Sequence, residues 1–206
     1  MRRGLLAAGA MMFAVLLCAS GALAQTQTEV ILDPLDHDNG KWQLNQWVTF
    51  ENGALHLHAS RVVWAYSFTD GSVRIDTEHV SGPLNKGYGL GFRLKIRGSD
   101  QAVSGYQLWI AANNGWKLVK RADGAFTDLT SWAPSDALHT GEGATNRIAV
   151  VCVGDGMLVM INDQLVGGAH DGTYTDGGVG PISTDDMDIA FRNLRIECAT
   201  GAGAQN

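Results

Sequence analysis

Two apolar runs flank Gly154-Asp155-Gly156 in the most regular part of the chain. Both runs alternate with a period of two, which is the side-chain period of a β-strand. Gly and Asp at the centre supply the backbone conformations of a tight turn. The pattern predicts a β-hairpin, and Asn162-Asp163 predicts a second turn after it. The positions expected to face the core are Ile148, Val150, Cys152, Met157, Val159 and Ile161.

Similar strand-length runs fill the rest of the chain. Asn-Gly or Asp-Gly pairs separate them at positions 39, 52, 70, 114, 123, 155, 171 and 176, and no long stretch has a helical period. This spacing is typical of a sandwich or barrel of short antiparallel strands. In two of the runs, alternation predicts inward-facing Tyr88, Leu90, Phe92, Leu94, Tyr106, Leu108 and Ile110, and outward-facing Arg93, Lys95, Gln107 and Trp109.

The first residues have the pattern of a secretory signal. Met1-Arg2-Arg3 precedes an apolar run over residues 4–17, and Ala22-Leu23-Ala24 ends in a small-residue cleavage site. We expect residues 1–24 to be a cleaved signal peptide and the mature protein to be periplasmic or secreted. Residues 25–198 are then one domain, and the small, polar residues 199–206 are expected to be a disordered tail.

Charge limits the partners of the mature chain. Removal of Arg2 and Arg3 lowers the number of Lys and Arg side chains from 15 to 13 against 21 Asp and Glu, so the net charge falls from −6 to −8. An acidic protein is a poor ligand for nucleic acid or for an anionic membrane surface. No later apolar run is long enough for an integral membrane segment.

Two cysteines, Cys152 and Cys198, remain after removal of residues 1–24. In an exported protein such a pair predicts a disulfide, with two buried free thiols as the alternative.

A series of short motifs recurs in order along the mature chain. They are Asn52-Gly53-Ala54-Leu55, Tyr88-Gly89-Leu90-Gly91-Phe92-Arg93, Tyr106-Gln107-Leu108-Trp109-Ile110, Asn146-Arg147-Ile148 and Ala190-Phe191-Arg192-Asn193-Leu194. This series resembles the concanavalin A-like lectin/glucanase superfamily, in particular bacterial laminin-G-like jelly-roll modules. The resemblance covers nearly all of the mature chain and implies an all-β, two-sheet antiparallel jelly-roll sandwich. The sequence departs from the family pattern at Asp163, where Gly is common, and at Arg192, where Asp is common.

Enzymes of this superfamily include glucanases, which act through carboxylate side chains. Retaining glycosidases use two carboxyl groups about 5–5.5 Å apart. Asp76 and Glu78 are two positions apart on one strand face, but a third acidic residue that similar glucanases carry is absent. The favoured alternative to catalysis is a solvated, charged strand surface with Arg74 as an ion-pair partner. A polysaccharide lyase is a further alternative, with His79, Arg93 and Lys95 as candidate residues. Their spacing matches no known lyase motif.

Two groups of residues are candidate metal ligands. Asp33, Asp36 and Asp38 near the start of the domain, and Asp186 and Asp188 before its last strand, offer the oxygen ligands that calcium prefers. If the terminal strands lie together, these residues predict a structural Ca²⁺ site. His56 and His58 point to the same side of one strand, as in zinc sites, but a third ligand is needed. Solvated turns and a polar strand face are the respective alternatives.

Trp109, Gln107 and Arg93 are predicted to share an outward face. An indole ring beside Arg and Gln donors suits a sugar, although packing of Trp109 under the loop over residues 126–143 is the alternative. We therefore expect an exported, non-catalytic binding module with a glycan as the first candidate ligand. A glycoside hydrolase or polysaccharide lyase of the same fold is the first alternative. A structural or adhesion module with a protein partner is the second.

Overall fold

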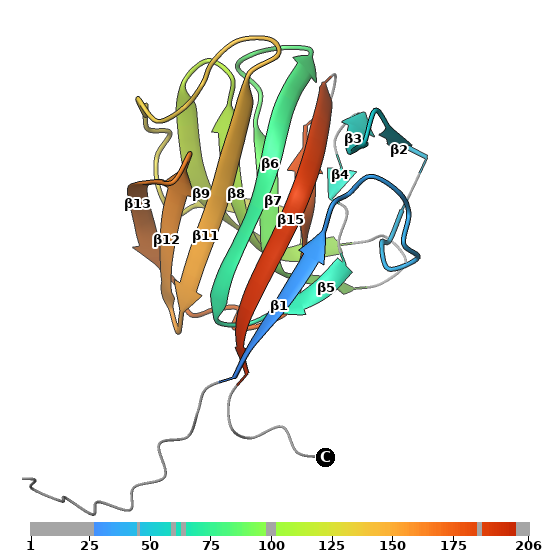
Figure 1. The fold of residues 1–206 in the computed structure, drawn as a ribbon. Helices are drawn as coiled ribbons and strands as arrows, with labels where there is room; N and C mark the ends of the chain where they lie inside the picture. The colour runs from blue at the N-terminus through green and yellow to red at the C-terminus, as the bar shows by residue number, and fades with distance from the viewer. Residues whose placement is uncertain are drawn as a thin grey trace, which may run out of the picture.

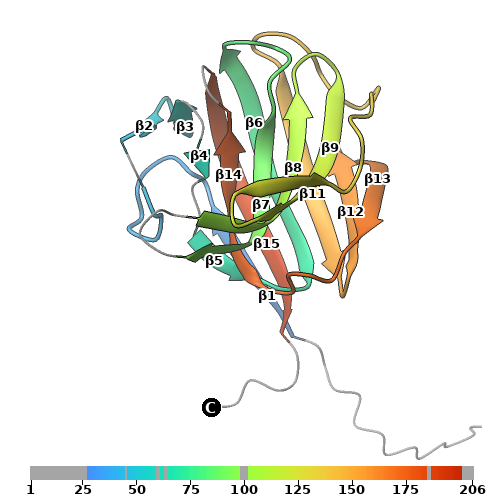
Figure 2. The same cartoon turned by 180° about the vertical axis from the view of Figure 1, so that it is seen from behind.

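The computed structural model describes residues 27–44, 46–58, 61–62, 65–97, 102–184 and 187–200. Within these ranges the chain forms two antiparallel β-sheets packed face to face, and no helix (Figures 1 and 2). The prediction of an all-β, two-sheet jelly-roll sandwich is confirmed. Sheet A, in front in Figure 1, has the strand order β13-β12-β11-β6-β15-β3-β2, with β1 also paired to β15. Sheet B has the order β10-β9-β8-β7-β14-β4, with β5 also paired to β14.

The strands of sheet A are β1 (Gln27–Asp33), β2 (Val48–Glu51), β3 (Ala54–His58), β6 (Gly71–Ser81), β11 (Thr145–Val153), β12 (Gly156–Ile161), β13 (Gln164–His170) and β15 (Asp188–Thr200). Those of sheet B are β4 (Arg61–Val62), β5 (Ala65–Phe68), β7 (Tyr88–Arg97), β8 (Ala102–Ala111), β9 (Gly115–Ala122), β10 (Ala125–Asp128) and β14 (Gly177–Ser183).

The predicted hairpin is strands β11 and β12, followed by β13. The six side chains of this hairpin that were predicted to face the core are all buried, and Val150 lies opposite Val159 in the register. Asn162 and Asp163 both have positive φ, 48° and 64°, which is the backbone of a type I′ turn between β12 and β13. Asp163 therefore adopts the left-handed conformation at a position where Gly is common in the resembling proteins.

The core lies between the two sheets. Sheet A contributes Ile75 and Phe191 from its long central strands β6 and β15, and sheet B contributes Leu90, Phe92 and other side chains, all fully buried. Each such side chain stabilises the fold by about 1.5–3 kcal/mol relative to its exposed state. Most of these positions are those that the alternation predicted to face inward.

A β-bulge in β7 changes the alternation after Phe92. The pairing of β7 with β8 shifts register between Phe92 and Lys95, and Arg93 has a positive φ of 50°. Leu94, predicted to face the core, instead packs against Gly91, on the opposite side of the strand from Phe92. Arg93, predicted to face outward, is 0% exposed. The parity prediction is wrong for both residues because a bulge inserts one extra residue into the strand.

The Arg93 guanidinium ties sheet B to three turns. Its Nη2 donates to Asp70 Oδ1 at 2.8 Å, and its Nε donates to the carbonyl of Thr69 at 3.1 Å. Its Nη1 donates to the carbonyls of Gly154 at 3.0 Å and Tyr174 at 3.1 Å. Thr69 and Asp70 precede β6, Gly154 lies between β11 and β12, and Tyr174 precedes β14. These partners satisfy the charge and the donors of a fully buried side chain.

The two cysteines are free, contrary to the predicted disulfide. Cys152 of β11 and Cys198 of β15 both lie opposite Gly71 of β6, one on each side of that strand. Two strand spacings, about 9.5 Å, therefore separate their backbones. A disulfide requires Cα atoms within about 7 Å, so β6 keeps the two thiols apart.

The domain limits differ slightly from the prediction at the C-terminal end. Strand β15 continues through Ala199 to Thr200, which pairs with Gln27 of β1. The predicted signal peptide, residues 1–24, and the rest of the predicted tail, residues 201–206, lie outside the described residues.

None of the described residues belongs to a helix with the length and apolar character needed to cross a lipid bilayer.

We predict that Arg93→Met destabilises the protein by about 3 kcal/mol, measured by guanidinium chloride unfolding. Removal of one partner of a buried ion pair costs about 3–5 kcal/mol, and the half-exposed carboxylate of Asp70 places this case at the lower end. Lys95→Met is the matched control, because Lys95 and Asp176 form an exposed pair. Its loss should cost less than about 1 kcal/mol. Equal effects of the two substitutions would contradict the role assigned to Arg93.

We predict two free thiols in the unfolded, unreduced chain that lacks residues 1–24. In the native protein Cys152 should not react with a thiol reagent near pH 8, because burial raises the pKa of its thiol to about 12. A Cys198→Ser variant isolates Cys152 and should show no reaction until the protein unfolds. If the unfolded protein contained no free thiol, the result would instead support a disulfide between Cys152 and Cys198.

Candidate functional site

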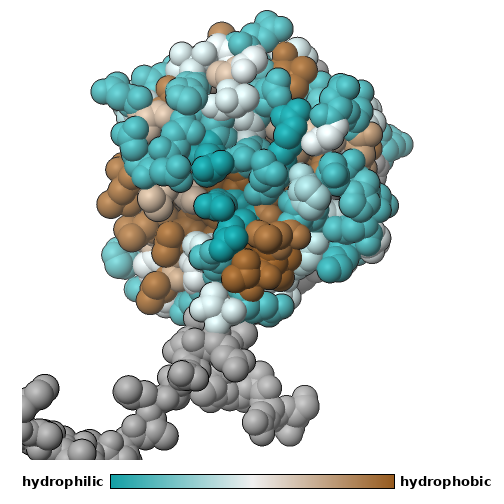
Figure 3. Space-filling view, viewed as in Figure 1, coloured by the Kyte–Doolittle hydropathy of each residue, from teal (hydrophilic) through white to brown (hydrophobic). Residues whose placement is uncertain are grey.

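A polar groove crosses the outer face of sheet A. Two adjacent pockets, of about 410 and 420 Å³, form it and share Asp76, Arg147 and Asn193. Figure 3 shows hydrophilic residues over the upper part and along the centre of this face, with hydrophobic patches beside them. The first pocket is also lined by Thr77, His139, Thr145, Asn146, Asn162, Asp163 and Arg192, and the second by Leu32, Asp33, Pro34, Arg74, Leu194 and Arg195.

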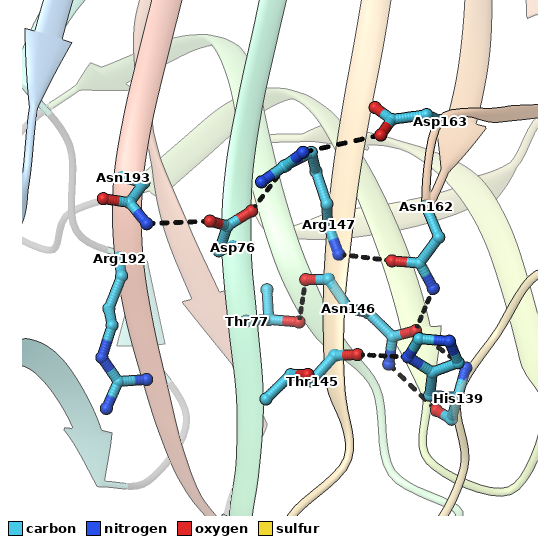
Figure 4. A pocket seen from close by; sticks show the side chains of 10 residues that line it. All are labelled: Asp76, Thr77, His139, Thr145, Asn146, Arg147, Asn162, Asp163, Arg192 and Asn193. Carbon is cyan, nitrogen blue, oxygen red and sulfur yellow. Dashed lines mark hydrogen bonds and ion pairs between the residues drawn. The ribbon is translucent and has the colours of Figure 1, made fainter.

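Asp76 of β6 stands at the junction of the two pockets (Figure 4). Its Oδ1 accepts a hydrogen bond from Arg147 Nε of β11 at 2.8 Å, and its Oδ2 accepts one from Asn193 Nδ2 of β15 at 2.9 Å. The Oδ2 atom of Asp163, in the turn after β12, lies 3.5 Å from Nη1 of the same guanidinium. Asp76 raises the pKa of Arg147 through its hydrogen bond and its charge. The three neighbouring strands therefore fix one carboxylate and one guanidinium in the floor of the groove.

A second β-bulge places two consecutive residues of β15 on this face. The pairing of β15 with β6 shifts register between Arg192 and Arg195, and Asn193 has a φ of 54°. Arg192 donates to Glu78 Oε2 at 2.8 Å, and its neighbour Asn193 donates to Asp76. Consecutive side chains of a regular strand point to opposite faces. The bulge is therefore the reason that both reach the groove.

A network of amides holds His139 at one wall of the groove (Figure 4). The side chain of Asn146 accepts from the His139 backbone N–H and donates to its carbonyl, both at 2.9 Å. Asn162 Nδ2 donates to Asn146 Oδ1 at 2.9 Å and thereby fixes the orientation of that amide. The His139 Nδ1 lies 2.8 Å from the carbonyl oxygen of Thr145. Because a carbonyl only accepts, Nδ1 carries a proton, and Nε2 of the neutral ring is an acceptor.

The two carboxylates considered for glycosidase chemistry, Asp76 and Glu78, both lie on the outer face of sheet A. Each is engaged by an arginine, Arg147 and Arg192 respectively, rather than by Arg74. This is the arrangement of cross-strand ion pairs that the sequence allowed as an alternative to catalysis. A nucleophile or general acid would first have to leave these partners.

The residues predicted to form a ligand face do not lie together. Trp109 and Gln107 share the outer face of sheet B, where the indole Nε1 donates to Gln107 Oε1 at 2.9 Å. Gln107 is 1% exposed, and Trp109 packs over Gly87 and makes a T-shaped ring contact with Phe126. Arg93 is buried between the sheets, and Asp76 and Glu78 are on the other sheet. The joint ligand face of Trp109, Gln107 and Arg93 is therefore not formed.

The predicted calcium ligands are also separated. Asp33 is buried, and its oxygens accept from Leu35 N, Asn39 Nδ2, Trp42 Nε1 and Tyr66 Oη at 2.7–3.0 Å. Burial and the hydrogen bond to this carboxylate raise the pKa of Tyr66 to about 12. Asp33 is thus a hydrogen-bonded anchor for the loop after β1.

The two acidic clusters lie at different levels of β15, one beside its middle and one at its first residue. Asp33 is opposite Leu194 of β15, whereas Asp188 is opposite His58, so about 20 Å of strand lies between them. Asp36 pairs with His37, and Asp38 Oδ1 accepts from the backbone of Gly40. Asp186 lies outside the described residues. The described carboxylates therefore do not converge on the shared Ca²⁺ site that the sequence predicted.

Sequence reasoning did not select Arg147, Asn193, His139 or Asn162 as site residues. Asn162 was recognised only as a turn residue, and Asn193 only as part of a motif. It also did not select a third pocket, of about 320 Å³, beside the half-exposed Trp132. That pocket lies at the turn between β8 and β9 and is also lined by Asn85, Ala111, Asn113, Asn114, Gly115, Ala133 and Pro134.

The chain belongs to the 3-keto-alpha-glucoside-1,2-lyase-like domain family, whose model matches residues 32–197. No curated protein matches the sequence. The fold is similar to that of the carbohydrate-binding module CBM66 from Bacillus subtilis, with a TM-score of 0.58 and 18% identity over 80% of this chain and 94% of that one.

Two further solved structures share the fold. A Bacillus subtilis protein of unknown function with a galectin-like fold has a TM-score of 0.63 and 16% identity over 82% of this chain and 94% of that one. The Bacillus licheniformis beta-glucanase has a TM-score of 0.59 and 10% identity over 83% and 98%. These likenesses show the jelly-roll fold, and the concanavalin A-like and laminin-G-like assignments stay predictions.

Proposed function

We propose that the protein binds a carbohydrate in the polar groove of sheet A, in the extracytoplasmic compartment expected from residues 1–24. The observation that carries this proposal is the continuity of the two pockets around Asp76, Arg147 and Asn193. Each pocket has a volume in the range of small-ligand sites, about 300–1,000 Å³. The family name and the carbohydrate-binding module among the structural neighbours support a sugar as the ligand.

The chemistry of the groove suits hydroxyl groups. Guanidinium groups offer only donors, carboxylates only acceptors, and the amides of Asn162 and Asn193 offer both. A sugar hydroxyl both donates and accepts, so neighbouring groups of opposite kind can bind it at two points. The ion pairs and amide contacts already hold these side chains in place. Little conformational entropy would be lost on binding, which favours affinity.

A glycan array followed by calorimetry with the best ligand tests the proposal. Arg147→Met should weaken binding at least about tenfold, since it removes a charged donor from the junction of the pockets. Trp132→Ala and Trp109→Ala test the third pocket and the outer face of sheet B, and both should bind as the wild type does. Loss of binding in Trp132→Ala with normal binding in Arg147→Met would move the site to the third pocket. No binding to any glycan would reject the proposal.

A catalytic role is the second candidate, and the proton position on His139 favours it. The family name describes 1,2-elimination from a 3-keto-α-glucoside. In that reaction a base removes the proton from C2, beside the C3 carbonyl. The C1–O bond breaks as a C1–C2 double bond forms, and the leaving oxygen takes up a proton. His139 Nε2 is a basic nitrogen at the groove wall, and Arg192 offers positive charge for the developing enolate.

For this second candidate we predict that p-nitrophenyl 3-keto-α-glucoside releases p-nitrophenol in the presence of the protein. His139→Gln should lower the rate by about 10²–10⁴-fold, the usual contribution of a general base. His170→Gln, at an exposed histidine on β13, is the control and should leave the rate unchanged. A wild-type protein that binds the glycan but releases no product would leave only the binding function.

A further inference from the structure

Two histidines and a glutamate meet at the edge of sheet A formed by β2 and β3. His56 and His58 of β3 and Glu51 of β2 each offer a ligand atom, and these atoms lie within 4.8 Å of one another. The His-x-His spacing puts both imidazoles on one face of the strand. Their rings are nearly parallel, with an interplanar angle of 19° and centroids 5.9 Å apart. The third ligand that the sequence alone did not supply therefore comes from the neighbouring strand.

Asp188 of β15 orients both imidazoles. Its Oδ1 lies 2.8 Å from His56 Nδ1 and 3.6 Å from His58 Nδ1. The two nitrogens of an imidazole point away from each other, so each Nε2 faces away from this carboxylate. A carboxylate on one ring nitrogen and a metal on the other is the usual arrangement of metal-binding histidines. Asp188, assigned from the sequence to calcium, fits this orienting role instead.

His56 gives an independent indication of a missing partner. The side chain is 5% exposed, and its Nε2 is buried with no hydrogen-bond partner among the described residues. A buried polar atom without a partner costs about 1–3 kcal/mol. On the other ring, His58 Nε2 lies 3.7 Å from Glu51 Oε1. A cation bound by both Nε2 atoms and by Glu51 would satisfy the orphan nitrogen.

We propose that Glu51, His56 and His58 bind a divalent transition metal, with zinc as the preferred ion, and that Asp188 positions the two imidazoles. Two histidines and one carboxylate with open coordination positions are a known ligand set for zinc and for iron(II). Ligand atoms around a tetrahedral zinc ion lie about 3.3 Å apart. His58 Nε2 lies 3.1 Å from Thr49 Oγ1, and Glu51 Oε1 accepts a hydrogen bond from the same hydroxyl at 2.9 Å. His58 and Glu51, 38% and 51% exposed, would exchange these contacts for the metal as they close the remaining distance toward the fixed His56. This site is separate from the groove and does not depend on the proposed carbohydrate.

The test uses zinc and cobalt(II) ions alone, added to protein that has been treated with chelator and dialysed. Competition with a chromophoric chelator should show one zinc ion per chain, and cobalt should give visible absorption bands of a site with nitrogen ligands. His56→Ala and His58→Ala should abolish stoichiometric binding. Asp188→Asn, which keeps the shape of the side chain, should lower zinc affinity by about 10–100-fold, as loss of a positioning carboxylate does.

Two further variants make the result decisive. Glu51→Gln changes an exposed side chain, so it tests the third ligand in a protein that keeps its fold. His170→Ala removes a histidine that faces Asp155 at 3.5 Å without a third ligand, and zinc binding should stay at the wild-type level. Absence of zinc binding in the wild type, or equal binding in the wild type and His56→Ala, would overturn the proposal.

Discussion

The buried Arg93 guanidinium is the contact on which the joining of the two sheets most depends. Hydrophobic packing between sheets is not directional, so it does not by itself determine how turns of one sheet meet strands of the other. Arg93 supplies direction because its donors reach Asp70, Gly154 and Tyr174 from a single strand of sheet B. The bulge in β7 makes this contact possible, since a regular strand would point the same side chain toward solvent.

The groove on sheet A depends on a bulge of the same kind. Asn193, like Arg93, has positive φ at a register shift, and both Arg192 and Asn193 consequently face outward. Each then engages a carboxylate on β6. Exposed ion pairs of this kind contribute little to stability, about 0–1 kcal/mol each. Their value lies in holding charged and amide groups in fixed positions, which is a property of a binding surface rather than of a core.

The sequence correctly predicted the features that depend on local pattern, namely strands, turns and the fold class. It did not predict the features that depend on how strands pair with one another. Alternation and Asp-Gly turns identified the β11–β12 hairpin, the inward-facing side chains and the all-β sandwich. Alternation misplaced Arg93 and Leu94, because a bulge is a property of two paired strands. The predicted disulfide and the shared calcium site failed for a related reason. Which strand lies between Cys152 and Cys198, and how far Asp33 is from Asp188, follow from sheet order and register. The bulge in β7 that buries Arg93 and the bulge in β15 that brings Arg192 and Asn193 to the groove left no mark in the periodicity.

Strand β15 links the groove and the histidine cluster on one face of the molecule. Asp188 faces His56, and Arg192, further along the same strand, faces Glu78. Ala190 lies between them and is paired with His56 on one side and Glu78 on the other. Two strand spacings, about 9.5 Å, therefore separate the backbones of His56 and Glu78, the carboxylate that Arg192 of the groove engages. Asp188 and Arg192 thus reach the two sites from the same outer face of one strand, so the geometry of β15 fixes the spacing between them.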